Sequence, residues 1–173
     1  MVTGVQTCAL PISVGLTFGM IFGAIIDLFP LHNDAFIRVP YKNDRLTTWV
    51  TENTAPTDIF LSDALLSHPI LFAGRKLFLG NTLFAWTAGY DLTDRENMYR
   101  KMFTERDLNE LTRLLHENKI DYVAIDDGVR SNGSIHGLNE SLYRDNFEKV
   151  FEDTDHKYGN LNIYRVASLL PSQ

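Results

Sequence analysis

The sequence of 173 residues is poor in the features that mark several common classes of protein. Its single cysteine, Cys8, cannot form an internal disulfide. Its five histidines are far apart and show none of the HxH, HxxxH or HExxH spacings of zinc ligands, so we expect no metal site and no cofactor. The net charge is -6 with lysines and arginines scattered, whereas a nucleic-acid-binding domain carries a basic stripe. We therefore expect no nucleic-acid partner.

Motifs for nucleotide binding and for nucleophilic catalysis are missing as well. A phosphate-binding loop needs its glycines between a strand and a helix, followed by Lys and then Ser or Thr. The segment from Gly74 to Gly80 does not fit, because Lys76 lies in the wrong place and apolar residues follow it. No serine lies in a Gly-x-Ser-x-Gly elbow. The sequence thus indicates no catalytic residue.

An apolar segment at residues 13–30 is the longest hydrophobic run in the chain. Its glycines Gly15, Gly19 and Gly23 repeat every four residues, a pattern that lets membrane helices approach closely. The run is about one turn shorter than the roughly 20 residues of a full span. We predict a truncated transmembrane helix. The alternatives are a signal anchor or a buried helix of a soluble α/β enzyme.

Residues 34–167 are expected to form one α/β domain, followed by a tail at 168–173. Apolar residues at helical spacing predict helices over 44–52, from 93 or 94 past Met102, from 104 or 105 to about 118, and from 139 or 141 to 151. Apolar runs bounded by turn residues predict strands at 58–62, 120–125 and 161–166, with 70–73 and 76–79 as two short strands or one bent strand. A helical turn is expected at 63–67. The predicted fold is a small layered domain of two or three layers with a mostly parallel sheet of four or five strands.

Candidate binding residues gather between residues 74 and 95. An arginine in a glycine turn, close to aromatic residues, is suited to grip a phosphate or a sugar, because the guanidinium makes bidentate contacts and the rings offer stacking faces. Alternatively, Arg75 and Asp91 form a structural ion pair. The candidate ligand-binding residues are Arg75, Trp86, Tyr90, Asp91 and Arg95, with Gly74, Gly80 and Gly89 at turn positions.

Two neighbouring aspartates follow a predicted buried strand. Asp126 and Asp127 stand where ligands bind in open α/β sheets, and paired carboxylates are able to hold a divalent cation. The alternative is an ordinary turn, for which the following Gly128 is typical.

Two stretches resemble known sequences. Residues 1–12, MVTGVQTCALPI, resemble the translated read-through of a sequencing-library adapter, which would make the chain the C-terminal remnant of a longer protein. The order of RLTTWVTENTAPTDIFLS, LFAGRKLFLG, GYDLTDRE and LLHENKIDYVAI, after an apolar helix, resembles the C-terminal extracytoplasmic domain of polytopic membrane proteins related to the C-type glycosyltransferases.

The resemblance implies an integral membrane protein with residues 34–167 on the extracytoplasmic side, and a parent that uses a lipid-phosphate-linked sugar as donor. The catalytic base of such enzymes lies in an early loop with no counterpart here, so the chain is expected to be inactive by itself. Its expected partners are its own missing transmembrane region, membrane lipid and a lipid-linked sugar. The alternative is a membrane-tethered glycan- or partner-binding module without enzymatic activity. The resemblance marks as signature positions Gly74, Arg75, Gly80, Gly89, Tyr90, Asp91 and Arg95.

Overall fold

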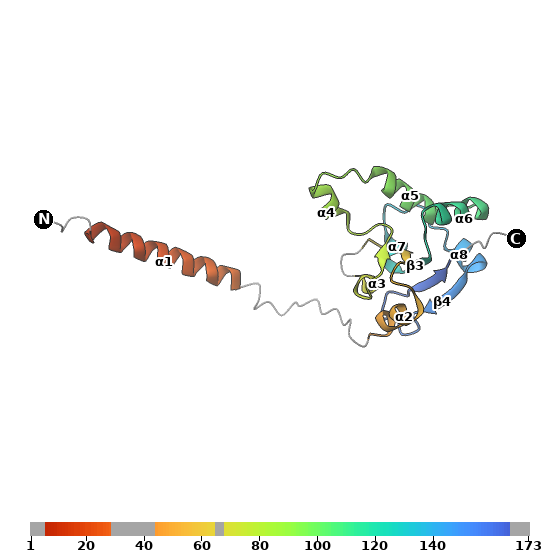
Figure 1. Ribbon diagram of the computed structural model, residues 1–173, viewed down its shortest axis with the longest axis horizontal. Helices are drawn as coiled ribbons and strands as arrows, with labels where there is room; N and C mark the ends of the chain where they lie inside the picture. Colours follow the sequence, from red (N-terminus) through yellow and green to blue (C-terminus); the bar gives the residue numbers. More distant parts are fainter. Residues whose placement is uncertain (1–5, 29–43, 65–67, 167–173) are drawn as a thin grey trace. The chain divides into compact units, whose positions relative to one another are not determined.

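The computed structural model describes residues 6–28, 44–64 and 68–166. The chain divides into two compact units, Met1–Arg38 and Val39–Gln173. The elements, seen in Figure 1, are α1 (Gln6–Leu28), α2 (Arg45–Asn53), β1 (Ile59–Leu61), α3 (Pro69–Phe72), β2 (Lys76–Leu77), α4 (Thr82–Thr87), α5 (Thr93–Thr104), α6 (Leu108–Glu117), β3 (Tyr122–Ile125), α7 (Asp127–Ser131), α8 (Glu140–Asn146), β4 (Glu148–Glu152) and β5 (Asn162–Arg165).

The first unit contains the long helix α1. This helix begins at Gln6, inside the segment that resembles an adapter, and the side chains of residues 11–26 are exposed, among them Phe18 and Phe22. Within the described residues, no helix combines the length and the hydropathy needed to cross a membrane. The structure therefore lends no support to the predicted transmembrane helix at 13–30.

The second unit is built on a five-stranded sheet in the order β2-β1-β3-β5-β4. β1 pairs in parallel with β2 and with β3, whereas β5 pairs antiparallel with both β3 and β4. The prediction of an α/β domain with four or five strands is confirmed, but the sheet is mixed rather than mostly parallel. The reason is that β4 and β5 form a hairpin, and a short connection can join only antiparallel neighbours.

Side chains alternate between two cores on the two faces of the sheet. In β3, Val123 and Ile125 join one core and Tyr122 and Ala124 the other. The first core is covered by α5, α6 and α8, and the second by α2 and α3, so the domain has three layers (Figure 1). The largest fully buried side chains are Tyr143, Tyr164, Phe60, Phe103, Leu46, Leu61, Ile70, Met102, Leu111, Leu114, Leu115 and Ile125.

Several helices follow the sequence pattern closely. The helix predicted over 44–52 is α2, and Asp44 caps it by accepting the backbone N–H of Thr47 at Oδ2, at 3.1 Å. The leucine-rich helix α6 buries Leu111, Leu114 and Leu115, and Asp107 caps it by accepting from the N–H of Glu110 at 2.8 Å.

One predicted strand is a helix, one predicted helix ends earlier than expected, and two short helices lie where no element was predicted. Residues 70–73 lie in helix α3 and its cap instead of a strand, because Pro69 occupies the first turn and the ring of His68 accepts the N–H of Ile70. The helix predicted to reach residue 151 ends at Asn146, and β4 follows because it pairs with β5. The unforeseen elements are the short helices α4 and α7. The helical turn predicted at 63–67 lies partly outside the described residues.

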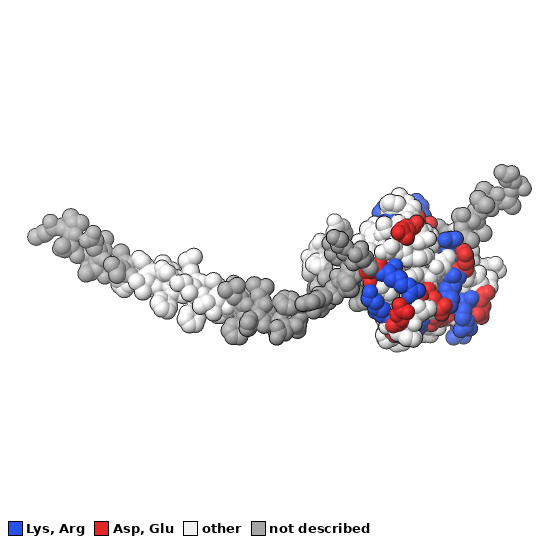
Figure 2. Space-filling model, turned by 90° about the horizontal axis from the view of Figure 1, so that it is seen from below, with Lys and Arg blue, Asp and Glu red and all other residues white. Residues whose placement is uncertain are grey.

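Charge is evenly mixed on the face of this unit that Figure 2 presents. Basic and acidic side chains are interspersed over it. Lys101 and Arg113 both contact Glu110 at 2.8 Å, and these contacts lower the pKa of Glu110 to about 2.

Candidate functional site

Arg75, the first predicted ligand residue, is buried and fully engaged by the protein. Its side chain is 8% exposed. Nη2 donates to the carbonyls of Val50, Thr51 and Thr54 at 3.3, 3.1 and 2.9 Å. Nη1 donates to the carbonyl of Ala73 at 2.8 Å, and Nε donates to Thr54 Oγ1 at 2.7 Å. The guanidinium therefore closes the carboxyl end of α2 against α3, where free carbonyls need donors.

Asp91 does not pair with Arg75 in the part of the chain that the structure describes. Instead Asp91 Oδ1 accepts the backbone N–H of Thr93 at 2.9 Å at the start of α5. Hydrogen bonds from the side chain and backbone of Thr93 lower the pKa of Asp91. The structural ion pair considered from the sequence is thus absent, and Asp91 presents an ionised, exposed carboxylate.

Arg95 is also held by its neighbours. Its guanidinium carbon lies 4.7 Å from the centre of the Phe78 ring, and Nε donates to the Phe78 carbonyl at 2.6 Å. These contacts tie α5 to the segment after β2. Arg95 lines a hollow of about 460 Å³ with Asp94, Glu117 and Lys119. It also lines a hollow of about 260 Å³ that shares Thr82 and Leu92 with the hollow lined by Trp86 and Tyr90.

Trp86, Tyr90 and Asp91, three of the five candidate ligand residues, lie together. They line a hollow of about 350 Å³ between α4 and the first turn of α5. Trp86 is 71% exposed and Tyr90 is 69% exposed, so both rings are accessible from solvent. The full lining is Thr82, Trp86, Tyr90, Asp91, Leu92, Thr93 and Glu96.

Gly89 shapes this hollow by closing α4. Its φ is +82°, a conformation that favours glycine. The N–H of Gly89 donates to the carbonyl of Trp86 at 2.9 Å, and that of Tyr90 donates to Ala85 at 3.0 Å, which is the Schellman arrangement. Gly74, with φ +75°, ends α3 in the same way. Gly80 has no positive φ, so backbone conformation does not require a glycine at this signature position.

The rest of α4 forms an uncharged, apolar surface. No charged residue lies between Lys76 and Asp91, and no residue of α4 is buried. Leu83 and Phe84 expose more than half of their surface on this helix. We call the segment from Thr82 to Tyr90 the α4 lobe. Clustered exposed apolar side chains of this kind mark an interaction surface.

A second polar cluster lies at the carboxyl ends of the parallel strands β1 and β3. Ser62 Oγ is 3.1 Å from His68 Nε2, and Asp126 Oδ2 is 3.6 Å from the same nitrogen. His68 Nδ1 accepts the N–H of Ile70 at 3.3 Å, which places the ring proton on Nε2. Serine and aspartate contact one nitrogen instead of opposite sides of the ring, and Ser62 is fully buried. This geometry is structural and does not activate a nucleophile.

Burial and neighbouring charge set the protonation of this cluster. Burial tends to raise the pKa of Asp126, but hydrogen bonds from His68 and the N–H of Val129 outweigh it and lower that pKa. The pKa of Asp63 is raised by burial and by the charge of Asp126. Burial, Asp63 and Asp126 together raise the pKa of Tyr99, whose buried hydroxyl has no hydrogen-bond partner among the described residues.

The two aspartates predicted as a possible cation site have structural partners. Asp126 Oδ1 caps α7 by accepting the N–H of Val129 at 2.9 Å. Asp127 accepts from Asn160 Nδ2 at 2.6 Å and from Arg130 Nη1 at 3.1 Å. The residues described contain no group of three or more His, Cys, Asp or Glu side chains that is able to hold a metal ion. The geometry fits the turn interpretation.

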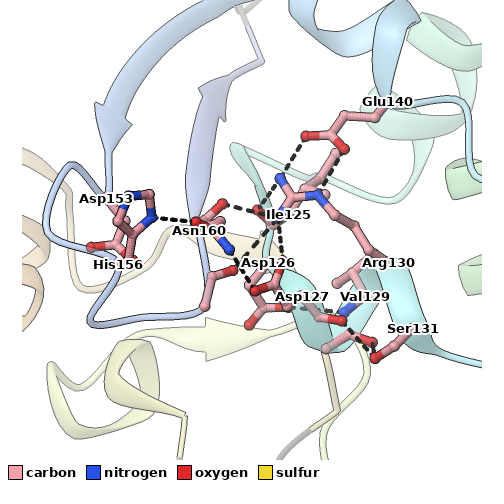
Figure 3. Close-up of polar contacts among 12 residues, drawn as sticks. Ile125, Asp126, Asp127, Val129, Arg130, Ser131, Glu140, Asp153, His156 and Asn160 are labelled. Carbon is pink, nitrogen blue, oxygen red and sulfur yellow. Dashed lines mark hydrogen bonds and ion pairs between the residues drawn. The ribbon is translucent and has the colours of Figure 1, made fainter.

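Arg130 is the centre of a network that the sequence did not reveal (Figure 3). Nε and Nη2 donate to the two oxygens of Glu140 at 2.9 and 2.6 Å, while Nη1 donates to the carbonyl of Asn160 at 3.0 Å. The guanidinium thereby joins α7, α8 and the loop before β5. Arg130 and Glu140 are ten residues apart in a region predicted as loop and helix, so no local pattern signals their contact.

Comparisons with known proteins add no assignment. No protein-family model matches the sequence, and the comparison with curated proteins finds no match.

Proposed function

We propose that residues 34–167 form the non-catalytic extracytoplasmic domain of an integral membrane, glycosyltransferase-like protein, where the domain packs over the membrane part and shapes the access of sugar or acceptor. The α4 lobe carries this proposal. Exposed Leu83, Phe84 and Trp86 on an uncharged segment suit a contact with lipid or with membrane helices, because tryptophan and tyrosine favour the interface between membrane and water.

The described polar clusters support a role without catalysis. Arg75, Arg130 and His68 all have structural partners, and none presents a free nucleophile or base beside a hollow. The resemblance noted from the sequence implies that the full-length parent is a membrane protein acting on a lipid-phosphate-linked sugar. The proposal does not require α1 to cross the bilayer by itself.

Local fluorescence at Trp86 tests membrane contact in the full chain. Sedimentation with vesicles is not decisive, because the apolar side chains of α1 also bind lipid. Trp49 is the other tryptophan and packs on Phe151 with ring centres 5.3 Å apart, so a Trp49→Phe variant leaves Trp86 as the only reporter. We expect its emission to shift to the blue on phosphatidylcholine vesicles and to be quenched by lipids brominated near the headgroup.

A matched variant separates the α4 lobe from α1. Leu83→Ser with Phe84→Ser, in the Trp49→Phe background, changes exposed side chains and spares both cores. We expect it to stay bound through α1 but to lose the blue shift. Equal shifts in both proteins, or none in either, would contradict docking through the α4 lobe.

The gene sequence upstream of this chain tests the proposed identity of the full-length parent protein. Sequence upstream of the codon for Ser13 is expected to encode several apolar spans of about 20 residues and an acidic pair in the first outer loop. An upstream region without a multi-helix membrane part would overturn the glycosyltransferase-like assignment. Membrane spans without the acidic loop would favour the tethered binding module instead.

A further inference from the structure

We infer that the hollow between α4 and α5 binds a neutral sugar ring, and that it discriminates against phosphate-bearing ligands. The inference rests on the proposed function, and it assigns the hollow to a neutral sugar of the acceptor, because the donor of such a parent carries phosphate. Two arginines suggested a phosphate grip from the sequence, but neither lines this hollow.

The size of the hollow suits a small ligand. Its volume of about 350 Å³ lies near the lower end of the 300–1,000 Å³ that ligand sites typically span. The Schellman closure at Gly89 fixes where Tyr90 leaves the helix, and Asp91 is fixed by the N–H of Thr93. The backbone that carries these wall residues is therefore held in place without any ligand.

The aromatic side chains provide stacking faces. Trp86 and Tyr90 line the hollow and are more than two-thirds exposed, so their rings are not consumed by core packing. The face of an aromatic ring carries partial negative charge and attracts the weakly positive C–H face of a sugar ring. A planar anion gains nothing from such a face.

The charges of the lining decide the class of ligand. Of the residues that line the hollow, Asp91 and Glu96 are the two that are charged at neutral pH, so the lining has two carboxylates and no lysine or arginine. Hydrogen bonds from Thr93 lower the pKa of Asp91, so this carboxylate stays charged at neutral pH. Carboxylates accept hydrogen bonds from hydroxyls and repel phosphate.

One of the two threonines in the lining, Thr82, favours a polyol over a simple cation. Thr82 adds a hydroxyl, which both donates and accepts, and sugar hydroxyls need partners of both kinds. An ammonium ion would use acceptors only. Mixed donors and acceptors around two ring faces are thus complementary to a neutral sugar.

Titration of the full-length Trp49→Phe protein tests the inference without lipid bilayers. The protein is kept in a polyoxyethylene detergent, because glycoside detergents would compete for the hollow. The probes are methyl β-D-glucopyranoside and its galacto and manno isomers. We expect at least one to change Trp86 emission saturably, with a dissociation constant on the order of 1 mM or weaker, as befits so small a ligand.

Variants of the lining assign the signal to this site. Tyr90→Ala is expected to weaken binding about three- to tenfold through loss of one stacking face. Asp91→Asn keeps the acceptor for the N–H of Thr93 and is expected to weaken binding about threefold or more. Arg100→Lys, on α5 but outside the lining, serves as the control and should bind like the parent variant.

Charged probes give the opposing results. Glucose 1-phosphate is expected to bind at least tenfold more weakly than the neutral glycoside. The double variant Asp91→Asn with Glu96→Gln should reduce this difference in affinity. Equal or tighter binding of glucose 1-phosphate, tighter binding of choline, or no saturable response to any glycoside would each overturn the inference. This titration contains no bilayer. A negative result would therefore not bear on the docking of the α4 lobe, which the vesicle experiment tests separately.

Discussion

Arg130 and Glu140 meet through two parallel hydrogen bonds, 2.9 Å from Nε to Oε2 and 2.6 Å from Nη2 to Oε1. The pair is partly buried and joins α7 to α8. Such a fork-to-fork contact depends on the planar guanidinium, which a lysine ammonium does not reproduce.

Replacing the guanidinium tests how much the network stabilises the domain. We expect Arg130→Lys to lower the free energy of unfolding by about 1–3 kcal/mol, because hydrogen bonds to Glu140 and to the carbonyl of Asn160 are lost. Urea denaturation of the full chain measures this. Arg144→Lys is the control: Arg144 is exposed and contacts only its neighbour Asp145 in the described ion pairs, so a change near zero is expected. Equal effects would contradict a special role for Arg130.

The same pair predicts a dependence of stability on pH. Hydrogen bonds from Arg130 lower the pKa of Glu140 below its ordinary 4.5, against a smaller opposing effect of burial. A carboxyl with a lowered folded-state pKa stabilises the fold above the unfolded value, and this contribution is lost as the pH falls through the folded value. We expect Glu140→Gln to be less stable than the wild type at pH 7. The difference should shrink below pH 4.5, and a constant difference from pH 7 to acid would refute the assignment.

The charge of Asp63 is expected to affect stability in the direction opposite to that of Glu140. Burial and the charge of Asp126 raise the pKa of Asp63 in the folded protein. The ionised carboxylate therefore opposes folding, and the protein loses stability as the pH rises through this raised pKa. Asp63→Asn keeps the acceptor for the N–H of Ala64 and removes the charge. We expect this variant to be more stable than the wild type at pH 7, with the gain fading in acid. Thermal melts at several pH values measure the difference, and a less stable variant at pH 7 would disprove the interpretation.

Two buried tyrosines form a matched pair. Tyr143 donates its hydroxyl to the carbonyl of Met102 at 2.7 Å, whereas the hydroxyl of Tyr99 is buried without a partner among the described residues. Tyr143→Phe is expected to cost about 1 kcal/mol through the lost hydrogen bond. Tyr99→Phe should be neutral or stabilising, because it removes an unsatisfied polar group. Denaturation midpoints decide this, and similar losses in both variants would mean that Tyr99 has a bound partner such as a water molecule.

Arg75 provides the test that separates a structural residue from a ligand residue. Arg75→Lys is expected to destabilise the domain by about 2 kcal/mol or more, because several carbonyls at the end of α2 lose their donor. Binding of glycosides to the folded variant should be unchanged. Arg100→Lys is the control, since Arg100 is bound to Asn97 on the surface at 2.6 Å. Unchanged stability with weakened sugar binding would restore Arg75 as a ligand residue.

The elements that the sequence predicted well are those with local signals. Asp44 stands before an amphipathic run, and the leucines of α6 recur at helical spacing, so cap and periodicity agree. Residues 147–151 show the limit: Phe147, Val150 and Phe151 fit helical spacing, yet pairing with β5 makes them extended. That pairing depends on residues beyond the Tyr158 loop, which no local window contains.

The candidate site residues also differ in how far local sequence determines their position. Trp86, Tyr90 and Asp91 lie close in sequence on one helix and its closing turn, so proximity along the chain predicted proximity in space. The burial of Arg75 could not be predicted, because it depends on where α2 packs and its partner Thr54 is distant in sequence. His68 carried only one usable signal, its place before Pro69 at a helix start.

The outer strands of the sheet have a consequence for how copies of this domain behave when crowded. β2 is only two residues long, and β4 carries Glu148, Lys149 and Glu152 with an irregular register beside Phe151. A short strand and a charged, bulged one both make poor templates for a strand from another chain. Neighbouring copies held at high density would therefore be protected from edge-to-edge β-aggregation.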